Sequence, residues 1–219
     1  MRALMTAAAL LAVPTAAIPS ASLNAAQTPA AQEWNIGPVI RGRNHSVGMP
    51  LNPLPSRRGP YFDFPYPNVN AGHVHYVTFR HGPLSGKRRI VMRYRIDAAP
   101  GVRFVARENA QLPATISLYF QRRGDSWSSK RGHEAYRWYA PERTIQRLTP
   151  GEHEMVVDLQ DRDWISVQVS TPATKPREFA EAVYQTDQVG FVLGARAGRG
   201  HGVFATGPAR LTILSFRVL

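Results

Sequence analysis

Cysteine is missing from the 219-residue chain. Its absence excludes disulfide bonds, thiolate metal sites and cysteine nucleophiles. The sequence also has no G-x-S-x-G nucleophile motif and no Walker phosphate-binding loop. Long apolar runs are missing too, because the run at residues 3–13 is about half the length needed to cross a bilayer. These absences exclude several enzyme classes and a spanning helix before any residue is assigned a role.

Lysine is scarce, and the positive charge comes from arginine. The chain carries 27 basic against 15 acidic residues, a formal charge of +12, and only three of the basic residues are lysines. The arginines are spread along the chain, whereas a nucleic-acid-binding surface normally shows as a basic cluster. We therefore expect no nucleic-acid partner. The excess charge instead favours attraction to an anionic polymer such as an acidic polysaccharide, or to a membrane surface.

The N-terminus has the pattern of a secretory signal peptide. Arg2 precedes the apolar run, and small residues follow as far as Ala31. We assign residues 1–31 to a signal peptide and a low-complexity linker, with residues 20–22 as one acceptable cleavage site. This segment predicts export to the bacterial periplasm or the outside, and the alternative is a buried N-terminal helix. Loss of Arg2 leaves 26 basic and 15 acidic residues, a charge of +11.

Proline divides the rest of the chain. Seven of the 18 prolines fall between residues 37 and 67, a spacing that excludes regular helix and central strand. We expect residues 32–67 to form an extended lead-in that wraps the domain, with a short strand near Val39. Residues 68–219 then form the folded domain, and this length suits one hydrophobic core.

Apolar and polar residues alternate through much of this domain. In residues 89–97 and 114–123 every second residue is apolar, the pattern of a strand buried on one face. Turn sequences rich in glycine and proline separate the segments, and one short helix is expected at residues 175–184. About nine short strands predict an all-β fold, an antiparallel β-sandwich of jelly-roll type. The remaining strands are expected at residues 73–80, 135–140, 154–159, 165–169, 189–193, 203–206 and 210–218.

The second half of the chain has a recognisable order of elements. A turn and strand at residues 148–159 (LTPGEHEMVVDL) are followed by Trp164, Phe179, the sequence VGFVLG at residues 189–194 and a final strand. This order resembles the galactose-binding-like β-jelly-roll superfamily, which includes many carbohydrate-binding modules and the complex I intermediate-associated family. The resemblance covers roughly residues 61–219. It implies a jelly roll and, because glycan binding is common in the superfamily, a carbohydrate ligand.

Aromatic and basic residues gather in residues 119–139. Sugar rings stack on aromatic faces, and arginine or glutamine hydrogen-bonds to hydroxyls and carboxylates. We expect polar residues of two strands to share one open sheet face, with Trp127 at its rim. The alternative places the aromatic residues at 136–138 in the core. The predicted ligand-binding residues are Arg93, Arg95, Tyr119, Gln121, Arg123, Trp127, Arg137 and Tyr139.

Two sets of residues have metal-ligand chemistry. His73 and His75 share a strand face about 6.6 Å apart, which permits chelation if another strand supplies a third ligand. Asp158, Asp161 and Asp163 follow a strand, and carboxylate oxygens in such a loop suit Ca²⁺. The alternatives are partly exposed strand histidines and a solvated turn with a local ion pair. No other cofactor is expected.

Three functions remain open at this point. The preferred function is non-catalytic binding of carbohydrate, acidic polysaccharide included. The first alternative is a polysaccharide-acting enzyme of the cell envelope, a glycoside hydrolase or lyase. Hydrolysis needs two carboxylates about 5 to 9.5 Å apart, and the sequence singles out no such pair among its glutamates. The second alternative is a structural or interaction protein of the envelope, which needs an exposed apolar patch. The oligomeric state is open.

Overall fold

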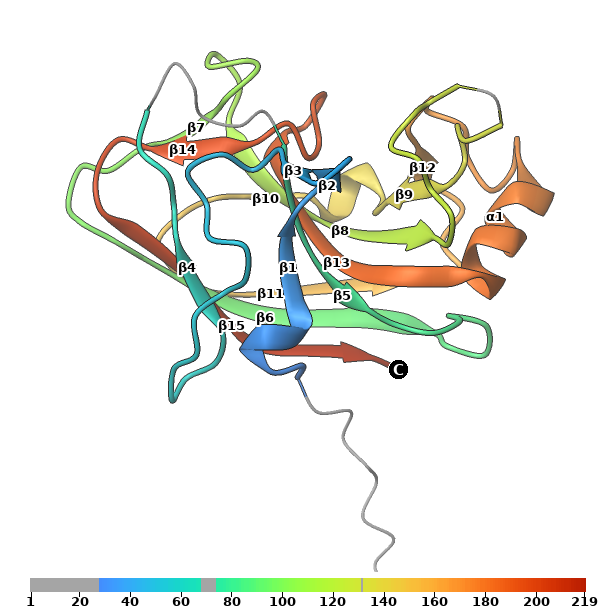
Figure 1. Ribbon diagram of the computed structural model, residues 1–219, viewed down its shortest axis with the longest axis horizontal. Coiled ribbons are helices and arrows are strands. Elements are labelled where there is room, and N and C mark those ends of the chain that lie inside the picture. The colour runs from blue at the N-terminus through green and yellow to red at the C-terminus, as the bar shows by residue number, and fades with distance from the viewer. Residues whose placement is uncertain (1–27, 68–73, 131) are drawn as a thin grey trace, which may run out of the picture.

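Two antiparallel β-sheets packed against each other form the body of the protein (Figure 1). The computed structural model describes residues 28–67, 74–130 and 132–219. Most of the predicted signal peptide, residues 1–27, and the predicted metal ligand His73 lie outside the described residues. No helix in the described part of the chain is long and apolar enough to span a membrane.

The elements follow one another along the chain with only one α-helix among them. Short 3-10 helices are η1 (Ala31–Glu33) and η2 (Glu142–Thr144), and the α-helix is α1 (Pro176–Tyr184). The strands are β1 (Trp34–Gly37), β2 (Val39–Ile40), β3 (Arg43–Asn44), β4 (Tyr61–Asp63), β5 (His75–Arg80), β6 (Arg89–Ala98), β7 (Phe104–Ala106), β8 (Ala114–Arg122), β9 (Arg137–Tyr139), β10 (Gln146–Arg147), β11 (Gly151–Asp158), β12 (Ile165–Ser166), β13 (Thr186–Ala195), β14 (Val203–Ala205) and β15 (Ala209–Val218).

The sheets differ in size. The larger has seven strands in the order β1-β5-β13-β8-β9-β12, with β10 paired to β8, and the smaller has the order β11-β6-β15-β4. Two-stranded ribbons, β7–β14 and β2–β3, lie outside them. The predicted all-β antiparallel sandwich with one short helix is confirmed. The strand expected at residues 165–169 stops at Ser166, because the chain turns there with Val169 at a φ of 61°.

The proline-rich lead-in supplies edge strands to both sheets. Strand β1 pairs with β5 at the edge of the large sheet, and β4 pairs with β15 at the edge of the small sheet. Edge positions tolerate nearby proline because one side of the strand makes no ladder hydrogen bonds. Trp34 of β1 is fully buried, and its indole Nε1 donates to the backbone oxygen of Pro29 at 3.2 Å. The lead-in therefore belongs to the sandwich core.

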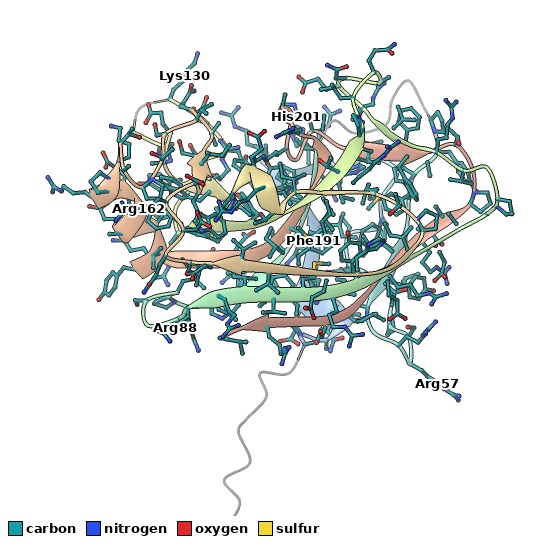
Figure 2. The ribbon with its side chains drawn as sticks, turned by 180° about the vertical axis from the view of Figure 1, so that it is seen from behind. Arg57, Arg88, Lys130, Arg162, Phe191 and His201 are labelled. Atoms are coloured by element: carbon teal, nitrogen blue, oxygen red, sulfur yellow. The ribbon has the colours of Figure 1, made fainter. Side chains whose placement is uncertain are left out.

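The main core lies between the two sheets. Inward residues of β6 and β8 meet there, as the alternation of residues 89–97 and 114–123 predicted. Figure 2 shows Phe191 of β13 between the layers. Aromatic rings join the two sheets: the Trp34 ring lies 5.4 Å from that of Phe216 and 4.7 Å from that of Phe79. This packing fixes the large sheet against the small one. The outer face of the large sheet carries the residues of the candidate site.

Candidate functional site

A second, smaller apolar cluster lies on the outer face of the large sheet. Tyr76, Tyr119, Tyr139 and Val192 come from β5, β8, β9 and β13, and each is at most 6% exposed. Strand alternation points these side chains away from the main core. The pairing registers place Tyr119 opposite Tyr139 and Val192 opposite Tyr76. We call these four residues the tyrosine cluster.

Two loops cover the tyrosine cluster. The Trp127 loop, residues 123–130, follows β8, and the Trp127 ring meets Tyr76 edge-on at 4.9 Å between centroids. The glycine-rich loop, residues 196–202, joins β13 to β14 and crosses Tyr76 at Gly200. Gly200 has a φ of 81°, and a Cβ there would lie 2.6 Å from the phenol ring. Only glycine allows this close approach, and the two loops explain why β8 is buried on both faces.

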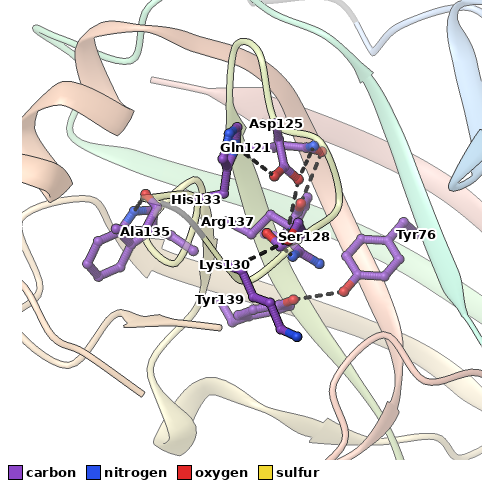
Figure 3. A network of polar contacts seen from close by, with 11 residues as sticks. Tyr76, Gln121, Asp125, Ser128, Lys130, His133, Ala135, Arg137 and Tyr139 are labelled. Carbon is purple, nitrogen blue, oxygen red and sulfur yellow. Dashed lines mark hydrogen bonds and ion pairs between the residues drawn. The ribbon is translucent and has the colours of Figure 1, made fainter. Parts of the chain in front are cut away.

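A chain of polar side chains runs along one side of the cluster (Figure 3). The Tyr119 hydroxyl donates to Gln121 Oε1 at 3.0 Å, and Gln121 Nε2 donates to Asp125 Oδ2 at 2.8 Å. Arg137 Nε lies 3.1 Å from the same carboxylate oxygen, and His133 Nδ1 lies 3.8 Å from Asp125 Oδ1. The Asp125 side chain is 0% exposed. Its carboxylate therefore forms the centre of a buried polar network.

The phenols form the second part of this network. The Tyr76 and Tyr139 hydroxyls are 2.7 Å apart, with either able to donate (Figure 3). Burial raises the pKa of Tyr76, Tyr119 and Tyr139, and the positive charge of Arg137 only partly opposes this. The phenols therefore stay protonated at neutral pH. They are suited to hydrogen bonding and poorly suited to accepting a proton.

Burial also acts on the carboxylate of the network. It raises the pKa of Asp125, while the nearby Arg137 guanidinium lowers it. Arg137 Nη2 in addition donates to the backbone oxygen of Ser128 at 3.3 Å. Arg137 thus holds both the buried carboxylate and the Trp127 loop.

Trp127 has a backbone conformation that side chains rarely adopt. Its φ is 61°, in the left-handed region, which costs a non-glycine residue roughly 1–2 kcal/mol. The Arg137 guanidinium lies 5.3 Å from the centre of the indole, which remains partly exposed. The residues on either side of Trp127 in the chain, Ser126 and Ser128, line a pocket of about 360 Å³ together with Lys130 and His133. Such strain concentrates at ligand sites, where the surrounding structure enforces it.

Five of the eight predicted ligand-binding residues come together here, namely Tyr119, Gln121, Trp127, Arg137 and Tyr139. The expected open face was wrong, because the two loops cover it and leave Tyr119 and Gln121 at most 4% exposed. The predicted set of ligand-binding residues omitted Tyr76, Asp125, His133 and Arg199. Each had a sequence signal: Asp125 and His133 lie in the aromatic and basic stretch at 119–139, Arg199 lies in a glycine-rich loop whose arginines could contact an anion, and Tyr76 alternates with the core residues of β5.

The expectation that Arg93 and Arg95 share this face was also wrong. Both lie on β6 in the small sheet, where they form ion pairs with Glu152 at 3.6 and 3.5 Å. The alternation of β6 and β8 is as predicted, but the two strands belong to different sheets. Arg123 follows the end of β8 and is exposed. Alternation assigns a residue to one face of its strand and carries no information about which sheet that strand joins.

Three of the predicted metal ligands, His75, Asp161 and Asp163, already have protein partners. His75 is 1% exposed, and its Nδ1 accepts a hydrogen bond from the backbone nitrogen of Val203 at 3.1 Å. Arg143 forms ion pairs with Asp161 and Asp163. Among the described residues, no three histidine, aspartate or glutamate side chains are grouped so that they could hold a metal ion.

No protein-family model, curated protein or solved structure matches the chain. Its function must therefore be inferred from the chemistry of the tyrosine cluster and of the loops that cover it.

Proposed function

We propose that the protein binds carbohydrate at the Trp127 loop without catalysing a reaction. The observation that carries this proposal is Trp127 itself, a partly exposed indole held in a left-handed backbone conformation, whose chain neighbours Ser126 and Ser128 line a polar pocket. Tyr76 and Arg137 contact the ring on the protein side. A side chain packed in this way loses little freedom when a ligand binds, which favours affinity.

The pocket at the Trp127 loop has the donors and acceptors that a sugar needs. Ser126 and Ser128 bring hydroxyl groups, and Lys130 and His133 bring nitrogen donors. Carbohydrate ligands present an apolar ring face together with hydroxyl groups around the ring edge. An indole supplies a partner for the ring face and the pocket residues supply partners for the hydroxyls. The fold-level resemblance to galactose-binding-like jelly rolls points in the same direction, by analogy alone.

The carboxylates favour binding over hydrolysis. Asp125 is the carboxylate that joins the network, and Gln121 and Arg137 both engage its Oδ2. Glu142 contacts Arg196, and Glu152 of the small sheet contacts two arginines of β6 and Arg58 of the lead-in. Two-carboxylate hydrolysis requires a facing pair across a cleft. Asp125, Glu142 and Glu152 are instead each in ion-pair contact with arginine.

Removing the indole should weaken carbohydrate binding. We expect Trp127→Ala to bind about tenfold more weakly than the wild type, because a stacking contact contributes roughly 1.4 kcal/mol. Glycan-array screening of the full chain identifies the probe, and calorimetric titration with that probe compares the variants. Tyr66→Ala, which removes an aromatic side chain that is 58% exposed elsewhere, should leave affinity unchanged.

Two results would contradict the proposal. One is a wild-type protein that retains no glycan on the array. The other is a Trp127→Ala variant that binds the selected glycan as tightly as the wild type does. A loss of affinity in Tyr66→Ala equal to that in Trp127→Ala would place the binding surface elsewhere.

A further inference from the structure

Arg199 brings a second buried guanidinium to the tyrosine cluster. It lies in the glycine-rich loop, next to the Gly200 that touches Tyr76, and is 8% exposed. Its Nη1 donates to the backbone oxygen of Ala140, the residue that follows Tyr139. Its Nε is buried and has no hydrogen-bond partner among the described residues. Buried donors are normally satisfied, and a bound water, ion or ligand is one explanation for a donor that has no protein partner.

Arg199 contacts the backbone of Ala140, and its charge acts on the neighbouring Tyr139. Burial lowers the pKa of Arg199, and its positive charge lowers the pKa of Tyr139. Arg137 acts on the same phenol with the same sign. Two guanidinium groups, one from β9 and one from the glycine-rich loop, therefore act on one buried tyrosine hydroxyl.

The buried charges around the cluster do not balance. Arg137 and Arg199 are 7% and 8% exposed, and Asp125 is the buried carboxylate in ion-pair contact with Arg137. The carboxylate that acts on Arg199 is Glu142, whose side chain is 56% exposed and contacts Arg196. Buried charges are normally paired, because an uncompensated one costs several kcal/mol. One additional negative charge would balance the two buried guanidinium groups.

We propose that the ligand of this site is an acidic saccharide whose carboxylate binds Arg199. The proposal rests on the proposed carbohydrate-binding function and adds the class of sugar, a uronic acid. A guanidinium presents a planar fork of donors that matches a carboxylate, and the unpartnered Nε belongs to that fork.

The test compares D-glucuronate with D-glucose, which differ at one carbon by a carboxylate in place of a hydroxymethyl group. Both are titrated into the full chain and followed by NMR, which detects binding down to about millimolar affinity. We expect the wild type to prefer glucuronate by about tenfold or more, since a hydrogen bond to a charged group contributes roughly 1.5–3 kcal/mol. Glucuronate should also raise the melting temperature, whereas glucose at the same concentration should raise it less.

Substitutions of Arg199 test whether this side chain causes the preference for glucuronate over glucose. Arg199→Gln should reduce the preference for glucuronate to less than about twofold, because the charge and the fork are both lost. Arg196→Gln, in the same loop but 67% exposed, should behave as the wild type does. If Arg199→Gln does not fold, Arg199→Lys decides. Lysine keeps a point charge without the fork, so the preference should fall by about fivefold while binding persists.

The remaining outcomes overturn the anion site at Arg199, the carbohydrate-binding function, or both. Equal affinity of the wild type for both sugars overturns the anion site and leaves carbohydrate binding standing. Another possible result is that the wild type binds glucuronate and acetate equally and does not bind glucose. If Arg199→Gln then binds neither anion, the anion site is supported and carbohydrate binding is overturned. No response to any of the three ligands overturns both. A glucuronate preference that survives in Arg199→Gln places the carboxylate away from Arg199 and overturns the proposal.

Discussion

Replacing Arg137 with glutamine is expected to lower the free energy of unfolding by about 3 to 5 kcal/mol, the usual cost of removing one partner from a buried ion pair. Arg137 Nε lies 3.1 Å from Asp125 Oδ2, and the two side chains are 9% and 0% exposed. Without the guanidinium, the buried carboxylate keeps the Gln121 amide, the backbone of Trp127 and the more distant His133 as neighbours. The loss should be measured by urea unfolding at neutral pH.

A double-mutant cycle separates the ion pair from other effects of the substitution. Asp125→Asn removes the charge and keeps an oxygen that Gln121 Nε2 can reach, so we expect a smaller loss than in Arg137→Gln. The double variant should lose less stability than the sum of the single variants, because it leaves no buried charge unpaired. Arg123→Gln, an exposed arginine in the Trp127 loop, is the control and should change stability by less than about 0.5 kcal/mol. Additive single losses would contradict a direct interaction between Arg137 and Asp125.

Strand β8 and the loops that cover it show which features of the fold the sequence reveals. Alternation predicted correctly that Tyr119 and Gln121 point opposite to Leu118 and Phe120 on β8. It could not reveal that loops would cover this face, because loop paths depend on a few backbone conformations. Trp127 at a φ of 61° and Gly200 at 81° are two of these conformations. Neither a tryptophan nor a glycine within a glycine-rich stretch signals its own dihedral angle.

The candidate site was partly predictable for a related reason. Trp127, Arg137 and Tyr139 stood out because aromatic and basic residues are dense in residues 119–139. Arg199 lies about sixty residues farther along, and its role follows from contact with Ala140, a backbone group without any sequence signal. Arg95 was assigned to the site because its strand has the correct alternation, although β6 pairs only with β11 and β15. Local pattern thus determined strand faces, and long-range pairing determined which residues met.

His75 gives the protein a predictable sensitivity to mild acid. It lies at the start of β5, 1% exposed, where Nδ1 accepts a hydrogen bond from the backbone of Val203 and Nε2 is buried. Burial lowers the pKa of His75 from its usual 6.5 to about 4. The unfolded chain therefore takes up a proton near pH 6.5, whereas the folded protein does so only near pH 4. Between these values the unfolded state binds more protons, so stability falls as pH falls.

The size of the effect follows from the difference between the two pKa values. The stability that neutral, buried His75 contributes is fully present above about pH 7. About 3 kcal/mol of this stability is lost as the pH approaches 4, at 1.36 kcal/mol per pH unit. Carboxylates also lose stability in acid, so the wild type must be compared with His75→Asn. Asparagine Oδ1 can accept the Val203 hydrogen bond and carries no titrating group. We expect His75→Asn to lose distinctly less stability than the wild type between pH 7 and about 4.5, measured by urea unfolding. Parallel losses in the two proteins would mean that the pKa of His75 is the same in the folded and unfolded states. That result would contradict the lowering of the His75 pKa by burial.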